Sequence, residues 1–160
     1  MPYFRTSRNV ELSTIYYLTT NLEADWSGIT VAKTFNQVYA KDVSLPIVLA
    51  RLADISTTRL EIGTTTLENR YLLIIDIFAR SDAQRLDLAD YIKEKINAGW
   101  THYDFSHVSG DKTELSRTAN GRNTVTDFIN DSRLDFGESG DEKDRFRHSI
   151  SVRVRNNAIT

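Results

Sequence analysis

The apolar positions near the start of the chain recur with a helical spacing. Four of them, together with Thr19, fall at steps of three or four residues and share one helical face: Leu12, Ile15, Tyr16 and Leu22. The pattern predicts a helix over residues 10–23. Asn9 precedes it and is suited to be the N-cap, because its side-chain oxygen can accept from an amide of the first turn.

A second helix is predicted over residues 82–97. Ser81 and Gln84 have the spacing of a capping box, in which each side chain accepts a hydrogen bond from the other residue's backbone amide. The expected buried stripe consists of Leu86, Ala89, Ile92 and Ile96. Gly99 is a suitable residue to end the helix.

The clearest strand is Tyr71 to Ala79, which is apolar on both faces and is therefore expected in the centre of a sheet, covered on both sides. A hairpin tip is expected at residues 63–66, and Asn120-Gly121 is either a second hairpin turn or plain loop. Other stretches have strand character: 29–39, 45–53, 58–62, 101–108, 133–136 and 145–155.

This order of elements, helix, strands, helix and strands, predicts an α+β fold with a mostly antiparallel sheet. The 160 residues fit a single domain over 1–160. No internal repeat or long linker divides the sequence.

Composition excludes several functional classes. The net charge of −2 argues against a dedicated nucleic-acid binder and against electrostatic docking on anionic membranes. The chain has no cysteine, which excludes disulfides, thiolate metal sites and cysteine nucleophiles and fits a protein made in a reducing cytoplasm. Its first ten residues lack the apolar region of a secretory signal.

Candidate chemistry is sparse, and we expect no enzyme, no cofactor and no metal site. The histidines at 102, 107 and 148 lack the spacing of metal ligands. Asp54 and Asp76 interrupt apolar strands and raise the alternative of a small hydrolase that also uses His102. The simpler interpretation is that Asp76 pairs with an arginine such as Arg51 or lies at an interface.

Arginines alternate along the last predicted strand, where Arg145, Arg147, Arg153 and Arg155 share one face. This stripe could face a partner or DNA, which leaves a nucleic-acid-binding module as a further alternative. The interpretation that we favour is an exposed sheet face balanced by nearby acids such as Asp144.

Two helices are too few to cover both faces of a sheet of five or more strands, so we expect the chain to associate. The apolar strand and the hairpin before it supply two different surfaces. The candidate subunit-interface residues are Arg59, Glu61, Leu67, Arg70 and Tyr71.

The segment TTTLENRYLLIIDIFARSDAQRLDLADYIKEKI, residues 64–96, resembles the neck and tail-terminator (tail completion) proteins of tailed bacteriophages. The stretches VELSTIYYLTTNLEADW, residues 10–26, and SLPIVLARLADISTTRLEIG, residues 44–63, fit the same pattern. The resemblance covers about residues 10–105 and carries over no catalytic motif.

The resemblance implies a structural virion protein that acts in the neck and is made in the host cytoplasm. It implies a ring of six or twelve copies, six being the commoner number, that caps the tail tube or joins it to the connector and portal. DNA would pass through the lumen without sequence readout. The alternative is a tail or baseplate accessory protein that forms no ring.

Overall fold

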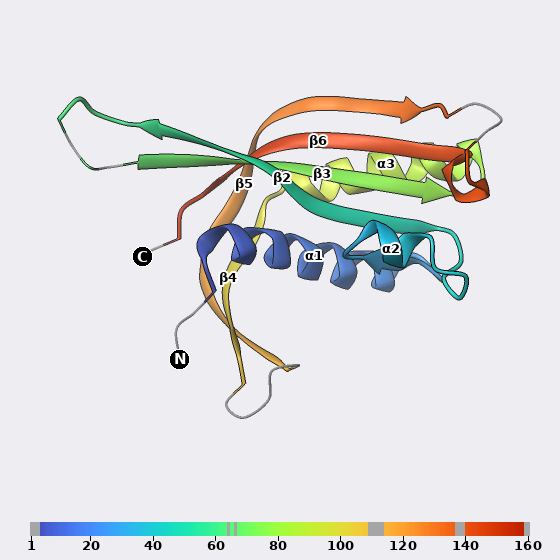
Figure 1. The fold of residues 1–160 in the computed structure, drawn as a ribbon, viewed down its shortest axis with the longest axis horizontal. Coiled ribbons are helices and arrows are strands. Elements are labelled where there is room, and N and C mark those ends of the chain that lie inside the picture. The colour runs from blue at the N-terminus through green and yellow to red at the C-terminus, as the bar shows by residue number, and fades with distance from the viewer. Residues whose placement is uncertain (1–3, 64, 66, 109–113, 137–139, 159–160) are drawn as a thin grey trace.

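A computed structural model describes residues 4–63, 65, 67–108, 114–136 and 140–158, and Figure 1 shows the fold. The helical elements of this part are α1 (Thr6–Asp25), α2 (Phe35–Val38), α3 (Asp82–Asn97) and the 3-10 turn η2 (Glu142–Asp144). Its strands are β1 (Thr30–Ala32), β2 (Ile47–Arg59), β3 (Leu67–Ala79), β4 (Trp100–His107), β5 (Leu115–Leu134) and β6 (Phe146–Asn156).

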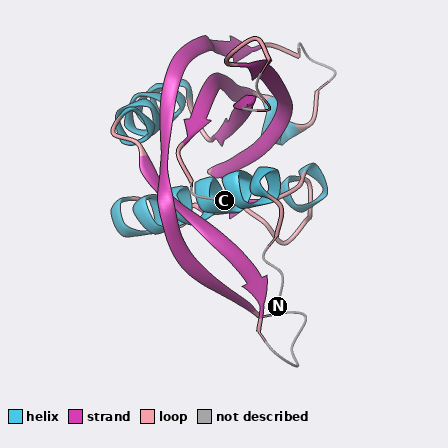
Figure 2. Cartoon of the chain, turned by 90° about the vertical axis from the view of Figure 1, so that its left-hand side faces the viewer, coloured by secondary structure: helices cyan, strands magenta, loops and turns pink. Residues whose placement is uncertain are grey.

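The six strands of the described chain form one sheet in the order β1-β2-β3-β6-β5-β4. Only the short β1–β2 pair of this sheet is parallel, and the other described pairs are antiparallel. The sheet curls strongly, as Figure 2 shows. The predicted α+β class with a mostly antiparallel sheet is confirmed, and β3 lies in the centre as expected.

The main core lies between the sheet and the helices α1 and α3. From β3 it takes Leu73, Ile75 and Ile77, which alternate along one face and are fully buried. The helices contribute Leu18 and Ile92, among others, to the same cluster. Both long helices therefore cover the same face of the central strands.

The opposite face of β3 is covered at one end only. There Phe78 joins a small second cluster with residues of α2, β1 and β2, including Val38 and Leu49. Further along the strand Leu72 and Ile74 are only half-buried. The expectation that β3 is covered on both sides therefore holds only for the end near Phe78.

The two predicted helices exist, with corrections to their details. Helix α1 begins at Thr6 rather than at residue 10, so Asn9 lies within the helix and does not cap it. In α3 the Ser81 hydroxyl accepts from the Gln84 amide as expected, while the Gln84 side chain accepts from Arg80 instead of Ser81. Leu86 is exposed, and Arg85 is buried on the core side of the helix.

Three predicted strands are wrong in type or extent. Residues 29–39 contain only the short β1, after which Thr34 caps the single turn of α2 by accepting from the Gln37 amide. Residues 47–53 and the first two residues of the stretch at 58–62 belong to one long strand, β2, which ends at Arg59. None of the helices in the described part is long and apolar enough to cross a membrane.

Strand β5 runs through Asn120-Gly121, so no hairpin turn occurs there. The first half of β5 pairs with β4 and the second half with β6, and Asn123 is paired with both Trp100 and Asn156. Gly121 has a φ of 87°, and a Cβ there would lie 2.7 Å from the Asn157 side-chain oxygen. Glycine thus permits both the bend and the close approach of the C-terminal segment.

Candidate assembly surfaces

The hairpin of β2 and β3 projects beyond the rest of the sheet as an arm, at the left of Figure 1. We call the described residues 56–63, 65 and 67–70 the β2–β3 arm, and the hairpin tip predicted at 63–66 lies partly outside the described residues. Pairing of β3 with β6 ends at Arg70, and beyond it the described arm strands pair with each other from Ser56↔Arg70 to Arg59↔Leu67. At about 3.3 Å per residue, the six steps from Ser56 to Ile62 span at most about 20 Å.

The arm carries apolar side chains into solvent. Ile62, next to the apex, is fully exposed, and more than half of the surface of Leu60 and of Leu67 is exposed. Isolated exposed apolar residues are ordinary, but three on one projecting hairpin are typical of an interaction surface. The arm is one of the two surfaces that the sequence predicted for association, and on the other, the uncovered face of β3, Leu72 and Ile74 are half-buried.

Ion pairs fix the root of the arm to the body. The Glu68 carboxylate lies 3.0 Å from the Arg155 guanidinium on β6 and 3.7 Å from that of Arg70. Beneath the arm, a groove of about 270 Å³ is lined by Leu60, Leu67 and other residues of α1, β3 and the C-terminal segment. The root is therefore tied to β6, while Ile62 near the apex is exposed.

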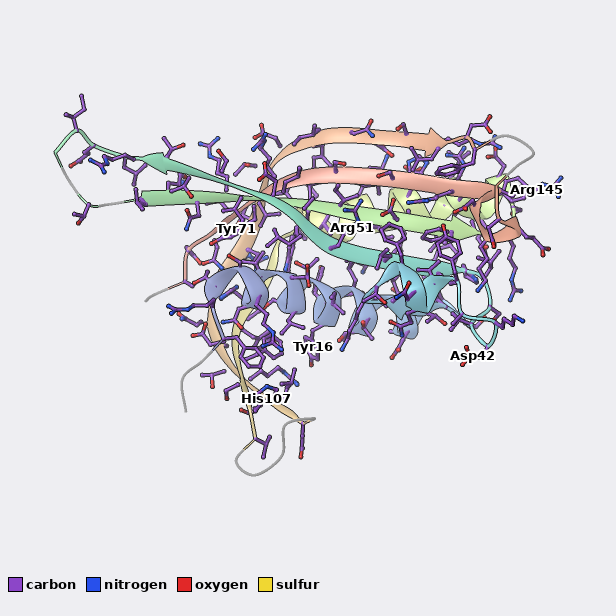
Figure 3. The ribbon with its side chains drawn as sticks, viewed as in Figure 1. Tyr16, Asp42, Arg51, Tyr71, His107 and Arg145 are labelled. Atoms are coloured by element: carbon purple, nitrogen blue, oxygen red, sulfur yellow. The ribbon has the colours of Figure 1, made fainter. Side chains whose placement is uncertain are left out.

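Four of the five predicted interface residues lie on this arm: Arg59, Glu61, Leu67 and Arg70. The prediction that Tyr71 lies at a subunit interface is wrong. Tyr71 is only 2% exposed and belongs to the main core, because it begins the inward-facing series of β3. Its ring is labelled in Figure 3 at the base of the arm and is not available to another subunit.

The predicted arginine stripe is broken by Arg147, whose side chain is 11% exposed. Its guanidinium lies 3.3 Å from Asp76 on β3 and 3.4 Å from Asp144 of η2. The Arg51 guanidinium approaches Asp76 from the other side at 3.6 Å. Asp76 thus pairs with Arg51, as the simpler interpretation held, and Arg147 is part of the interior.

The other stripe arginines have separate surroundings. Arg145 precedes β6 and is exposed, with its guanidinium over the Phe146 ring at 5.5 Å from the centroid. Arg155 is paired with Glu68, and Arg153 is half-buried opposite Leu72. The four arginines therefore do not form one continuous basic surface.

The candidate carboxylate pair does not come together. Asp54 is exposed opposite Leu72, whereas Asp76 lies four residues further along β3, opposite Leu49. At about 3.3 Å per residue this separates them by roughly 13 Å along the strand, too far to share a proton or a substrate atom.

His148 is held between α3 and β5. The Arg85 guanidinium can only donate, so Nδ1 of His148 accepts its hydrogen bond. The ring hydrogen is therefore on Nε2, and this N–H donates a hydrogen bond to the Asp131 carboxylate. Lys93 lies 2.7 Å from the same carboxylate. Burial acts to raise the pKa of Asp131, but the hydrogen bonds from Lys93 and His148 outweigh it and lower that pKa.

His102 is fully buried on β4, and burial lowers its pKa, an effect that the nearby Asp104 carboxylate only partly opposes. Its Nε2 lies 3.6 Å from the Asp104 carboxylate. His107 lies near the outer end of the same strand, against the Phe4 ring. No group of three or more His, Asp or Glu side chains is arranged for a metal ion in the residues that the structure describes.

A pocket of about 330 Å³ lies between α1 and the start of β4. Its lining includes Tyr16, Tyr17, Trp100, Tyr103 and Arg122. Tyr17 stacks on Trp100, and Tyr16 meets Tyr103 edge to face at 5.5 Å between ring centroids. Figure 3 shows Tyr16 on α1, close to the β4–β5 hairpin.

The guanidinium of Arg117 on β5 extends this aromatic surface. It lies over the Tyr16 ring, 4.2 Å from the centroid, and donates to the Tyr16 hydroxyl. Sequence reasoning missed the pocket, because Tyr16 was assigned to the core stripe and β5 was not recognised as one strand. The Tyr16-Tyr17 pair within a predicted helix was the available signal.

No protein-family model matches the chain, and a comparison with curated proteins likewise finds no match.

Proposed function

We propose that the chain is a ring-forming structural subunit of the neck of a tailed bacteriophage, in the role of a tail terminator or head–tail joining protein. The observation that carries the proposal is the β2–β3 arm, which holds Leu60, Ile62 and Leu67 exposed on a projecting hairpin. Such a feature needs a surface on another chain to cover it.

A second line of support is the order of the elements. A long first helix, a hairpin leading into a central apolar strand, an amphipathic helix and closing strands are what the resemblance of residues 10–105 implies, and the protein has this order. Because many functions share a fold, this agreement supports the proposal only together with the arm.

The proposed mechanism is geometric. An arm on one side of the subunit that binds a different surface of the next copy makes a heterologous interface, and such interfaces close into rings when the rotation between copies allows it. The ring would cap the tail tube, bind connector or portal-side proteins and surround DNA. A near-neutral chain suits a lumen that holds DNA loosely, since strong basic charge would bind it.

The alternatives are weaker on specific grounds. A hydrolase would lack its carboxylate pair, because Asp54 and Asp76 lie apart. A nucleic-acid module would lack its stripe, because Arg147 is paired inside the protein. An accessory protein of the tail or baseplate that forms no ring shares the arm and is distinguished by the shape of the assembly.

The test is the mass and shape of the purified protein at high micromolar concentration. We expect native mass spectrometry to give six or twelve copies and negative-stain images to show closed rings. A monomeric mass, together with no binding to tail-tube or portal proteins, would overturn the proposal. Open or irregular oligomers would favour the accessory protein.

A further inference from the structure

The pocket between α1 and β4 has no role in the fold described so far, and its lining is typical of a protein-binding surface. Tyrosine, tryptophan and arginine dominate the strongest contacts of protein interfaces, and such contacts gather in pockets. Here Tyr16, Tyr17 and Tyr103 supply partly exposed rings, and the buried Trp100 lies against Tyr17. Arg122 in the lining and Arg117 beside Tyr16 supply positive charge.

The pocket is small. Its volume of about 330 Å³ is near the lower end of the range of about 300–1,000 Å³ for sites that bind drug-sized molecules. Aromatic rings line it, and polar groups such as the Thr20 hydroxyl and the Arg122 guanidinium accompany them. An aliphatic side chain with a neighbouring carboxylate fits this chemistry.

The apex of the β2–β3 arm has that chemistry. Ile62 is fully exposed and Leu60 half-exposed, and Glu61 stands between them in the sequence. Insertion of the apex would bury both aliphatic side chains against the rings. It would also bring the Glu61 carboxylate towards the guanidinium groups at the pocket, a charge complementarity that favours this occupant.

We propose that the arm of one copy inserts Ile62 into the α1–β4 pocket of the next copy. This inference rests on the proposed ring, for which it names the two surfaces that meet. The arm and the pocket are different parts of the protomer, so each copy offers one arm and one pocket. The contact is therefore heterologous, and it repeats around a closed ring.

The absence of cysteine from the natural sequence allows a direct test by site-specific cross-linking. One variant carries Ile62→Cys at the apex of the arm, and a second carries Thr20→Cys, an exposed position in the pocket lining. The two are mixed under assembly conditions and treated with a short bis-maleimide. A third variant, Ile129→Cys, is the control, because Ile129 is half-exposed on the far half of β5.

We expect a covalent dimer in the mixture of the Ile62→Cys and Thr20→Cys variants, and monomers when either is treated alone. The chain carrying both substitutions should give a ladder of cross-linked species. Ile62→Cys mixed with Ile129→Cys should give at least tenfold less dimer. Ile62→Asp should abolish assembly, whereas Ile129→Asp should leave it intact.

The outcomes separate the two proposals. If the protein assembles, but the pair at 62 and 20 cross-links no better than the control and Ile62→Asp still assembles, the arm–pocket contact is wrong and the ring stands. If every variant and the natural protein remain monomeric at high concentration, both proposals fail. A cross-link at these positions in open chains would support the contact and overturn the ring.

Discussion

The guanidinium of Arg147 lies 3.3 Å from the carboxylate of Asp76 and joins β6 to β3 on the outer face of the sheet. Asp76 is 1% exposed and also receives Arg51. Two arginines compensate the charge of a buried carboxylate. If one member of such a cluster is removed, the remaining charged groups stay buried without a counter-ion. The contact therefore matters for stability and explains the charge within an apolar strand.

Asp76→Ala should lower the free energy of unfolding by about 3 kcal/mol, since Arg147 would keep only Asp144 as a partner. Urea unfolding followed by circular dichroism measures the change. Asp54→Ala is the matched control, because Asp54 is exposed, and its effect should stay within about 0.5 kcal/mol. Equal effects of the two substitutions would contradict the buried ion pair.

His102 should make the protein less stable in mild acid. Burial lowers its pKa below the ordinary value of 6.5, so between the two values the unfolded chain binds more protons than the folded one. Its contribution to stability is complete above about pH 6.5 and declines as the pH falls towards the folded pKa, by at most about 1.4 kcal/mol per pH unit.

The direct measurement for His102 is its titration by NMR, which should give a midpoint below 6.5. A His102→Gln variant should lose part of the slope of stability against pH between 5 and 6.5. His107→Gln is the control, because His107 is only half-buried. A midpoint at or above 6.5 for His102 would show that the Asp104 carboxylate dominates instead.

Substitution of two neighbouring leucines of β3 tests whether α1 and α3 cover the same face of the sheet. Leu73 is fully buried under α1 and α3, whereas Leu72 is half-buried on the other face. Leu73→Ala should cost about 3 kcal/mol of stability. Leu72→Ala should cost about 1 kcal/mol, because less apolar area is lost from the core. Chemical denaturation of both variants checks the difference.

Shortening the arm should abolish assembly and leave the protein folded. Replacing residues 58–68 with Asn-Gly joins the paired residues Thr57 and Asn69 by a two-residue turn that suits a hairpin. The removed residues include Glu68, whose partner Arg155 is 59% exposed and stays solvated without it, so the melting temperature should change by only a few degrees. Light scattering should give a monomer, and an assembly of unchanged mass would exclude the arm as a contact.

Long periodic segments were the most predictable part of the fold. Helix α1, the apolar run of β3 and the capping residue Ser81 each follow from local spacing, and each is present, although only Ile15 and Leu22 of the predicted α1 stripe are buried. The errors lie where local and tertiary preferences compete. Residues 29–39 alternate only loosely, and Thr34 with Gln37 provides a capping bond that starts a helical turn instead.

Long-range pairing accounts for the remaining errors. The sequence around Asn120-Gly121 is typical of a hairpin turn, but the ladder to β4 on one side and to β6 on the other keeps it extended. The same holds for Arg147 and Tyr71, whose burial depends on neighbours across the sheet. From the sequence alone, Arg147 was predicted on the arginine stripe and Tyr71 at a subunit interface.

Because β5 changes partner at Asn123, two ladders meet at one fully buried residue. A pull on the β4–β5 hairpin would be resisted by the first ladder and by bonds to α1, such as that from the Tyr103 amide to the Ser13 hydroxyl, and a pull at Leu134 by the second ladder. Mechanical load would pass between them through the backbone around Asn123. One uninterrupted backbone thus couples the hairpin that packs on α1 to the central strands, and a disturbance at Asn123 would reach both ladders at once.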